Sequence, residues 1–226
     1  MLAGGTGTRM GHKLPKQYIE IKGKPIIYYT LRPILESGLF KDVVICAEPQ
    51  WHEYIMGHLP SAAENITIGF STPGKTRQFT IFNALKLIAE KYHDCKSVVI
   101  HDAARPLVSI DLLKRCLSGL SQADGVLPVI KVKDTIYQSE DGKTVSGLLD
   151  RSTLYAGQAP EAFRFKPYLE AHLKSSEEEL LKINGSSELA LVKGLKVDLT
   201  HGDENNFKIT SPEDLEMFKQ ILEQRC

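Results

Sequence analysis

The sequence has no excess of either charge, because 28 lysines and arginines balance 28 aspartates and glutamates. Without a net positive field we expect no nucleic-acid partner, and any basic function must be confined to a local pocket. No apolar run approaches the roughly 18 residues of a transmembrane helix, and no signal-peptide pattern opens the sequence. We therefore expect a cytoplasmic protein with no membrane partner.

Cysteine is scarce, and its placement favours no metal or disulfide chemistry. The four cysteines are Cys46, Cys95, Cys116 and Cys226, and they form no C-x-x-C pair. This wide spacing predicts free thiols in a reducing compartment, and neither a disulfide framework nor a zinc site. The seven histidines show no metal-ligand spacing either.

Hydrophobic residues make up an ordinary 42% of the sequence, and its 226 residues suit one large domain or one domain with an appendage. Periodicity predicts helices at residues 26–35, 51–58, 78–92 and 110–120, and strands at residues 41–47, 65–69, 97–101 and 125–132. A C-terminal helix is predicted to begin at Pro212, with Ser211 as its N-cap. Strands and helices thus alternate, which predicts an α/β fold with a mostly parallel sheet covered on both faces. In such sheets, ligands bind outside the carboxyl ends of the strands.

The alternation breaks at residues 133–158. Two short strand patterns flank a polar turn at residues 139–142, and no helix follows them. This pattern predicts a β-hairpin. Because an isolated two-stranded hairpin is only marginally stable, it needs a surface to pack on, and a partner subunit is one candidate.

A glycine-rich loop opens the chain, where residues 2–10 read LAGGTGTRM. Small residues at 4–8 let backbone N–H groups converge on an anion without interference from Cβ atoms. Arg9 and Lys16 add two positive charges, so the loop predicts a polyphosphate site. The alternative is a strand–helix turn that binds no ligand.

A second segment, GFSTPGKT at residues 69–76, matches the P-loop pattern letter for letter between a predicted strand and a predicted helix. However, Pro73 has no N–H to donate to a phosphate. Residues 77–79 also crowd the helix start. We disfavour a P-loop and keep a kinase or NTPase that uses Lys75 as an alternative.

Polar residues also follow the strand at 97–101, in the segment HDAARP. Asp102 and Arg105 are placed there to meet a metal ion and an anionic substrate, or alternatively to form an ion pair that caps the next helix. Thr135, Arg151 and Lys208 lie in further polar segments. Each alone predicts a solvated loop, but together they supply two more cations for a phosphate.

The ordered set LAGGTGTRM, PKQY, HDAARP, KDTI, LDR, QAPEAF and NFKITSPEDL resembles the bacterial cytidylyltransferases. These include the 2-C-methyl-D-erythritol 4-phosphate and ribitol 5-phosphate enzymes. The resemblance implies a single three-layer, Rossmann-like nucleotidyltransferase domain over residues 1–226. It also implies a homodimer in which a β-arm at about residues 133–158 crosses to the partner. The implied reaction transfers CMP from CTP to a polyol phosphate and releases pyrophosphate.

The resemblance further implies roles for individual residues. CTP would contact Ala3, Gly4, Gly5, Thr6, Gly7, Thr8, Gly74, Thr80 and Ala103. The catalytic charges would be Arg9, Lys16, Arg151 and Lys208. The acceptor would contact Arg105, Thr135, Arg151 and Lys208, and Asp102 would help to bind Mg²⁺. No nucleophilic side chain is needed, because nucleotidyl transfer depends on positioning and charge neutralisation.

Differences from the methylerythritol-phosphate enzymes fall on the acceptor side. Ala159 replaces a threonine, residues 184–186 replace an acidic segment, and Asn205 replaces an aspartate. These differences, the glycine-rich opening and the Gly157-Gln158 pair together favour ribitol 5-phosphate as the acceptor. Methylerythritol phosphate is the alternative acceptor. A catalytically silent binding protein of the same fold is a third hypothesis.

The resemblance also implies a strand ahead of the glycine-rich loop, although the loop here begins at Leu2. A sheet without that strand would leave the neighbouring backbone unpaired. We therefore expect the sequence to start after this strand, and we do not expect the fold to omit it.

Overall fold

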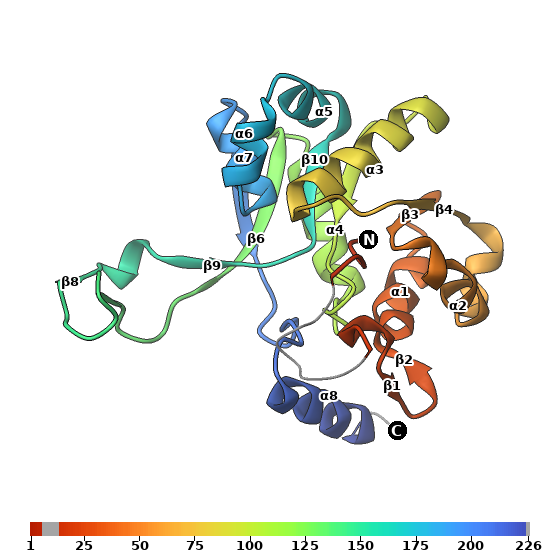
Figure 1. Ribbon diagram of the computed structural model, residues 1–226, viewed down its shortest axis with the longest axis horizontal. Coiled ribbons are helices and arrows are strands. Elements are labelled where there is room, and N and C mark those ends of the chain that lie inside the picture. The colour runs from red at the N-terminus through yellow and green to blue at the C-terminus, as the bar shows by residue number, and fades with distance from the viewer. Residues whose placement is uncertain (6–13, 225–226) are drawn as a thin grey trace.

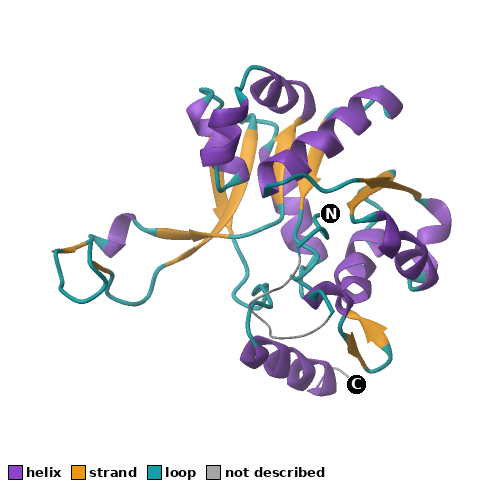
Figure 2. Cartoon of the chain, in the orientation of Figure 1, coloured by secondary structure: helices purple, strands orange, loops and turns teal. Residues whose placement is uncertain are grey.

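The computed structural model describes residues 1–5 and 14–224 and shows an α/β arrangement from which an arm projects (Figure 1). Figure 2 shows strands in the centre and helices around them. The strands of the main sheets are β3 (Asp42–Cys46), β4 (Thr67–Ser71), β5 (Ser97–Ile100), β6 (Gly125–Lys131), β9 (Tyr155–Gly157), β10 (Glu161–Arg164) and β11 (Val197–His201). A separate small hairpin joins β1 (Glu20–Ile21) to β2 (Lys24–Pro25).

The sheet is mixed in direction, which differs from the predicted mostly parallel sheet. One group of strands has the order β11-β6-β10-β5, and β9 also pairs with β6. The pairs β3–β4 and β6–β11 are parallel, although β11 was not predicted as a strand, whereas β10 is antiparallel to both of its neighbours and β9 is antiparallel to β6. Sequence patterning missed β10, because four residues directly after a proline give no periodic signal.

Residues 1–3 join the two main groups of strands. Leu2 forms parallel bridges to Cys46, at the end of β3, and to Asp102, just after β5. The N–H of Leu2 donates to the carbonyl of His101 at 2.8 Å, and the N–H of Ala3 donates to that of Cys46 at 3.0 Å. The backbone of Ala3 is therefore used in the sheet.

Eight α-helices belong to the described residues: α1 (Ile26–Glu36), α2 (His52–Gly57), α3 (Arg77–Lys91), α4 (Ile110–Gly119), α5 (Phe165–Leu173), α6 (Glu177–Lys182), α7 (Ser186–Val192) and α8 (Pro212–Gln224). The helices predicted from periodicity are present within a few residues of their predicted ends. Local capping explains some of these ends. The N–H of Leu112 donates to the Ser109 side chain at the start of α4, and that of Asp214 donates to the Ser211 side chain at the start of α8.

Helices cover both faces of the sheet. On one face α1 and α4 pack through Leu31 and Leu112, and on the other α3 and α5 pack through Leu85 and Tyr168. A third apolar cluster anchors α8 through Phe218. Two-sided burial accounts for the continuous apolar runs in β3 and β6.

The predicted hairpin at 133–158 forms the arm, which leaves the sheet after β6 and returns as β9 (Figure 1). Its tip pairs β7 (Tyr137–Gln138) with β8 (Gly147–Leu148). Tyr137, Val145 and Leu148 are all more than 60% exposed there. These apolar side chains are the feature that a packing partner would cover.

The described cysteines Cys46, Cys95 and Cys116 are free, as predicted. Within residues 1–5 and 14–224, no helix is both long and apolar enough to cross a membrane.

Candidate active site

A polar cleft of about 580 Å³ lies at the carboxyl end of β5. Four segments that are distant in the sequence meet there, namely residues 2–5, 73–77, 102–104 and 208–210. The structure thus brings together most of the predicted site residues that it describes: Gly4, Gly5, Lys16, Gly74, Thr80, Asp102, Ala103 and Lys208.

Two glycines permit the close approach of the loops that form the cleft. A Cβ on Gly4 would lie 2.5 Å from Cγ of Pro73, and one on Gly74 would lie 2.4 Å from Cβ of Phe79. Both distances are far below van der Waals contact, so larger residues would push the loops apart. Gly4 is therefore packed directly against the segment between β4 and α3.

Gln17 holds the entry to the glycine-rich loop, and sequence reasoning gave it no role. Its side-chain amide donates to the carbonyls of Ala3 at 2.6 Å and Gly5 at 2.9 Å, and it is almost fully buried. The neighbouring Lys16 donates through Nζ to the carbonyl of Ile209 at 2.6 Å. The sequence feature that could have indicated a role for Gln17 is its position next to Lys16 in the PKQY motif.

Asp102 is the centre of a cluster of positive side chains. Its carboxylate lies 2.9 Å from Nζ of Lys208, and 3.7 Å from guanidinium nitrogens of both Arg77 and Arg105. Burial alone would raise the pKa of the carboxyl, but the charges of Lys208 and Arg77 outweigh it and hold the pKa well below its ordinary value. Asp102 is therefore a carboxylate throughout the physiological pH range.

Arg77 and Glu161 extend this cluster, and neither was predicted. The Arg77 guanidinium lies 3.2 Å from Glu161 and also donates to the hydroxyl of Ser186. The other Glu161 oxygen accepts from the backbone N–H and the hydroxyl of Ser187, at 2.9 and 2.7 Å. Glu161 thus fixes Arg77 between two carboxylates, one of them Asp102.

Arg105 faces the protein and not the cleft. Its guanidinium donates to the carbonyl of Asn206 at 2.7 Å, and its side chain is only 13% exposed. Arg105 thus forms an ion pair with Asp102 inside the protein, which agrees with the alternative interpretation of the HDAARP segment. Its predicted contact with the acceptor stays a prediction.

The P-loop interpretation of residues 69–76 is wrong. The N–H of Gly74 donates to the Thr80 hydroxyl at 2.9 Å, so it is used inside the protein. Lys75 is half-exposed, forms an ion pair with Glu177 of α6 and lies over the Phe79 ring at 4.7 Å. A P-loop lysine must instead point to the phosphates above the helix start.

Other predicted site residues lie elsewhere or outside the described part of the chain. Thr135 is exposed on the arm, as is Arg151, whose guanidinium donates to the carbonyl of Lys133 at 2.8 Å. Thr6, Gly7, Thr8 and Arg9 fall outside the described residues.

The chain matches a known family over nearly its whole length. The family model described as IspD, 2-C-methyl-D-erythritol 4-phosphate cytidylyltransferase, matches residues 1–224. A protein of that name from Rubrobacter xylanophilus is 37% identical over 226 residues, covering 100% of this chain and 94% of the relative. Another, from Caldanaerobacter subterraneus, is 32% identical over 225 residues, covering 98% of this chain and 96% of the relative.

Solved structures show the same fold. The 2-C-methyl-D-erythritol 4-phosphate cytidylyltransferase of Thermus thermophilus matches with a TM-score of 0.73 and 26% identity, over 92% of this chain and 93% of that one. A 4-diphosphocytidyl-2C-methyl-D-erythritol synthase from Anaerococcus prevotii matches with a TM-score of 0.80 over 98% and 95% of the two chains. At 24% identity, the latter supports the fold alone.

These findings confirm the resemblance to cytidylyltransferases but overturn the predicted acceptor, ribitol 5-phosphate. The family model and both relatives carry the methylerythritol-phosphate name. Two residues behind the prediction have internal structural roles. Gln158 exchanges hydrogen bonds of 2.9 and 3.0 Å with the backbone of Asp203, and Ala159 is buried. The identities of Gln158 and Ala159 therefore reflect packing inside the protein and do not indicate which acceptor is bound.

Proposed function

Because the chain belongs to the 2-C-methyl-D-erythritol 4-phosphate cytidylyltransferase family, we propose that it transfers CMP from CTP to 2-C-methyl-D-erythritol 4-phosphate and releases pyrophosphate. Membership makes the chain a CTP-dependent nucleotidyltransferase, so the P-loop kinase and the silent binding protein are set aside. The observation that carries the proposal is the family match over residues 1–224, joined to a cleft that gathers Gly4, Gly5, Lys16, Asp102 and Lys208.

The proposed chemistry is in-line attack by a phosphate oxygen of the acceptor on the α-phosphorus of CTP. The bond from the α-phosphorus to the bridging oxygen breaks, and pyrophosphate leaves. Lys16, Lys208 and Arg9 neutralise charge on the phosphates, and Gly4 and Gly5 line the same cleft as Lys16 and Lys208. No covalent intermediate is required, because positioning and charge neutralisation lower the barrier.

The nucleoside end of CTP is assigned to the other side of the cleft. Gly74, Thr80 and Ala103 line the cleft, and residue 74 must be a glycine because a Cβ there would collide with Phe79. The hydrogen bond from Gly74 to Thr80 holds this edge in place. These residues are proposed to contact the cytosine and the ribose.

Mg²⁺ is proposed as the metal cofactor, and the residues present fit it. Mg²⁺ commonly takes one or two protein carboxylates and completes its coordination with substrate phosphates and water. Asp102 is ionised and lines the cleft, although the described residues form no group of three or more acidic, histidine or cysteine ligands. Asp102 would therefore hold the ion together with CTP. When bound, the ion adds positive charge at the phosphates.

A homodimer is proposed from the arm. Tyr137, Val145 and Leu148 expose apolar surface on it, and a second subunit would cover them. Thr135 and Arg151 on this arm would then contact the acceptor in the partner's site. A cytoplasmic location is also proposed, supported by the free thiols.

The test is pyrophosphate release from CTP and Mg²⁺ with separate acceptors. We expect turnover with 2-C-methyl-D-erythritol 4-phosphate, and rates at least about 100-fold lower with ribitol 5-phosphate and glycerol 3-phosphate. Faster turnover with another acceptor would reject the proposed substrate. Background rates with every acceptor would reject the catalytic function as a whole.

A further inference from the structure

Gln17 binds the backbone at the start of the glycine-rich loop. It belongs to the short 3-10 turn Lys16–Tyr18 and is only 3% exposed. Its amide nitrogen lies 2.6 Å from the carbonyl oxygen of Ala3 and 2.9 Å from that of Gly5. A side-chain amide has two N–H donors, so this buried amide gives one to each carbonyl. One side chain thereby holds both ends of residues 3–5.

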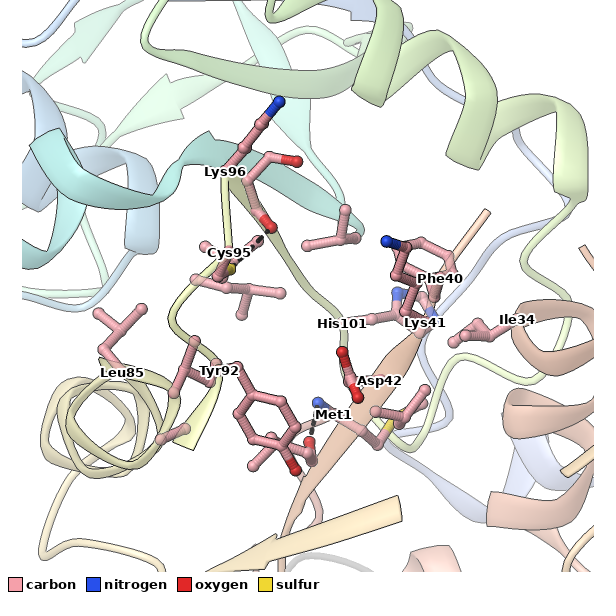
Figure 3. A pocket seen from close by; sticks show the side chains of 18 of the residues that line it. Met1, Ile34, Phe40, Lys41, Asp42, Leu85, Tyr92, Cys95, Lys96 and His101 are labelled. Carbon is pink, nitrogen blue, oxygen red and sulfur yellow. Dashed lines mark hydrogen bonds between the residues drawn. The ribbon is translucent and has the colours of Figure 1, made fainter. Parts of the chain in front are cut away.

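Residues 1–3, which lead into the loop, are fixed as well. Met1 lies at a separate cavity of about 1150 Å³ between β3 and β5, and its amino group donates to the carbonyl of Val44 at 2.8 Å (Figure 3). Leu2 uses both of its backbone groups on the β5 side, because its N–H donates to His101 at 2.8 Å and its carbonyl accepts from Ala103 at 3.0 Å. The loop therefore continues directly from an anchored segment.

These anchors determine where the N–H of Gly4 points. The peptide bond between Ala3 and Gly4 is trans, so its N–H points away from the carbonyl that Gln17 holds. Leu2 faces β5, whereas Ala3 faces β3, because its N–H donates to Cys46 at 3.0 Å. The same alternation along the extended backbone directs the N–H of Gly4 to the β5 side. It therefore faces the residues that follow β5 and line the cleft.

The N–H of Gly4 has no acceptor within the protein. No residue in the ranges 1–5 and 14–224 accepts a hydrogen bond from it. On the side that it faces, Asp102 lies among three cations, namely Lys208, Arg77 and Arg105, so this wall of the cleft is positively charged. An unused backbone donor beside such a wall suits an anion, and a phosphate group is the anion that a nucleotide supplies.

We propose that Gln17 is a positioning residue for the nucleotide phosphates. By holding the carbonyls of Ala3 and Gly5, it keeps the peptide between Ala3 and Gly4 in the orientation in which the N–H of Gly4 donates to a phosphate oxygen. Without Gln17 the peptide can turn over, which replaces this donor with a carbonyl oxygen that repels the phosphate. This role rests on the proposed function, in which the phosphate belongs to CTP.

The test measures the affinities for sodium tripolyphosphate, CTP and cytidine in the presence of Mg²⁺ by titration calorimetry. Tripolyphosphate has no nucleoside and cytidine has no phosphate, so the two probes separate the ends of the ligand. We expect Gln17→Met to weaken tripolyphosphate and CTP by about tenfold or more, and cytidine by less than about twofold. In turnover, KM for CTP should rise by a similar factor while KM for the acceptor stays unchanged.

The matched control is Gln158→Met. Gln158 is also a buried glutamine, it exchanges two hydrogen bonds with the backbone of Asp203, and it does not line the cleft. Both variants thus lose two hydrogen bonds between a side chain and the backbone. The control should leave all three affinities within about twofold of those of the parent chain, even where its Tm falls as far as that of the Gln17 variant.

Equal losses for cytidine and tripolyphosphate in Gln17→Met would overturn the proposal, because Gln17 would then serve the fold alone. Unchanged tripolyphosphate affinity would overturn it too. If the variant does not fold, the parent chain labelled with ¹⁵N is titrated with tripolyphosphate. A downfield shift of the Gly4 amide proton supports the proposal, and an unmoved Gly4 signal contradicts it. A parent chain that binds CTP and tripolyphosphate but turns over no acceptor would reject the proposed reaction, while these affinities would still decide the role of Gln17.

Discussion

Nζ of Lys208 lies 2.9 Å from Oδ2 of Asp102, so a cation from the C-terminal part of the chain sits against the carboxylate that follows β5. Lys208 is about one-third exposed, whereas the Asp102 side chain is nearly buried. The lysine therefore faces both the carboxylate and the open cleft. A phosphate bound there would meet a lysine whose position is already fixed.

Replacing Lys208 tests this arrangement. We expect Lys208→Met to lower kcat/KM for CTP by about 100-fold, which is typical for removing one charge-stabilising group. The matched control is Lys182→Met, because Lys182 pairs with Glu178 on the surface, outside the lining of the cleft, and its loss should change kcat/KM less than about twofold. Pyrophosphate release measures both variants. A larger loss in the Lys182 variant would contradict the assignment.

Glu161 should act by positioning Arg77. Glu161→Gln keeps an acceptor for Ser187 but removes the negative charge that lies 3.2 Å from the guanidinium. We expect kcat/KM for CTP to fall by about tenfold, while Tm stays within a few degrees.

The control for this variant is Glu177→Gln, which removes the same charge from an exposed pair and should leave kcat/KM unchanged. Glu161→Asp should recover part of the loss by restoring the charge. If Glu161→Gln matches the parent chain in kcat and KM, the contact with Arg77 has no part in catalysis.

The arm can be tested by mixing inactive subunits. We expect Arg151→Ala and Lys208→Ala to be inactive separately. If Arg151 acts in the partner's site, co-refolded mixtures should recover about one quarter of the parent activity, because half of the dimers are mixed and each has one intact site. If Arg151 acts within its own subunit, mixing restores nothing. Light scattering on the same samples reports the dimer directly.

Acid should weaken the fold through His172. Its ring is buried against Phe82 and Tyr168, and burial lowers its pKa to about 4 from an ordinary 6.5. The unfolded chain then binds a proton below pH 6.5 that the folded chain does not bind until about pH 4. Stability from this group is therefore complete above pH 6.5 and falls as the pH drops toward 4.

Between pH 7.5 and pH 5 the expected loss from His172 is about 2 kcal/mol. Urea unfolding at the two pH values measures it, and His172→Phe should reduce the difference by a similar amount. The exposed His93 provides the control, since His93→Phe should leave the difference unchanged. An unaltered pH dependence in the His172 variant would assign the acid sensitivity to other groups.

Much of the fold follows from local patterns. The helix predicted at residues 78–92 is α3 (Arg77–Lys91), because its apolar spacing and its cap are properties of neighbouring residues. Short segments were less predictable. In β10, the burial of Glu161 depends on Arg77 and Ser187, which reach it from distant parts of the chain. No local pattern contains that information.

The sequence by itself determined the kinds of group at the site, namely a glycine-rich loop, lysines and one aspartate in ordered motifs. Only the tertiary structure decided which of two lysines forms an ion pair with that aspartate. Lys75 and Lys208 carry the same charge, but packing turns Lys75 toward Glu177 of α6 and places Lys208 against Asp102. The energy of a charge depends on its distance to other charges and on its burial, and both are set by packing between distant segments.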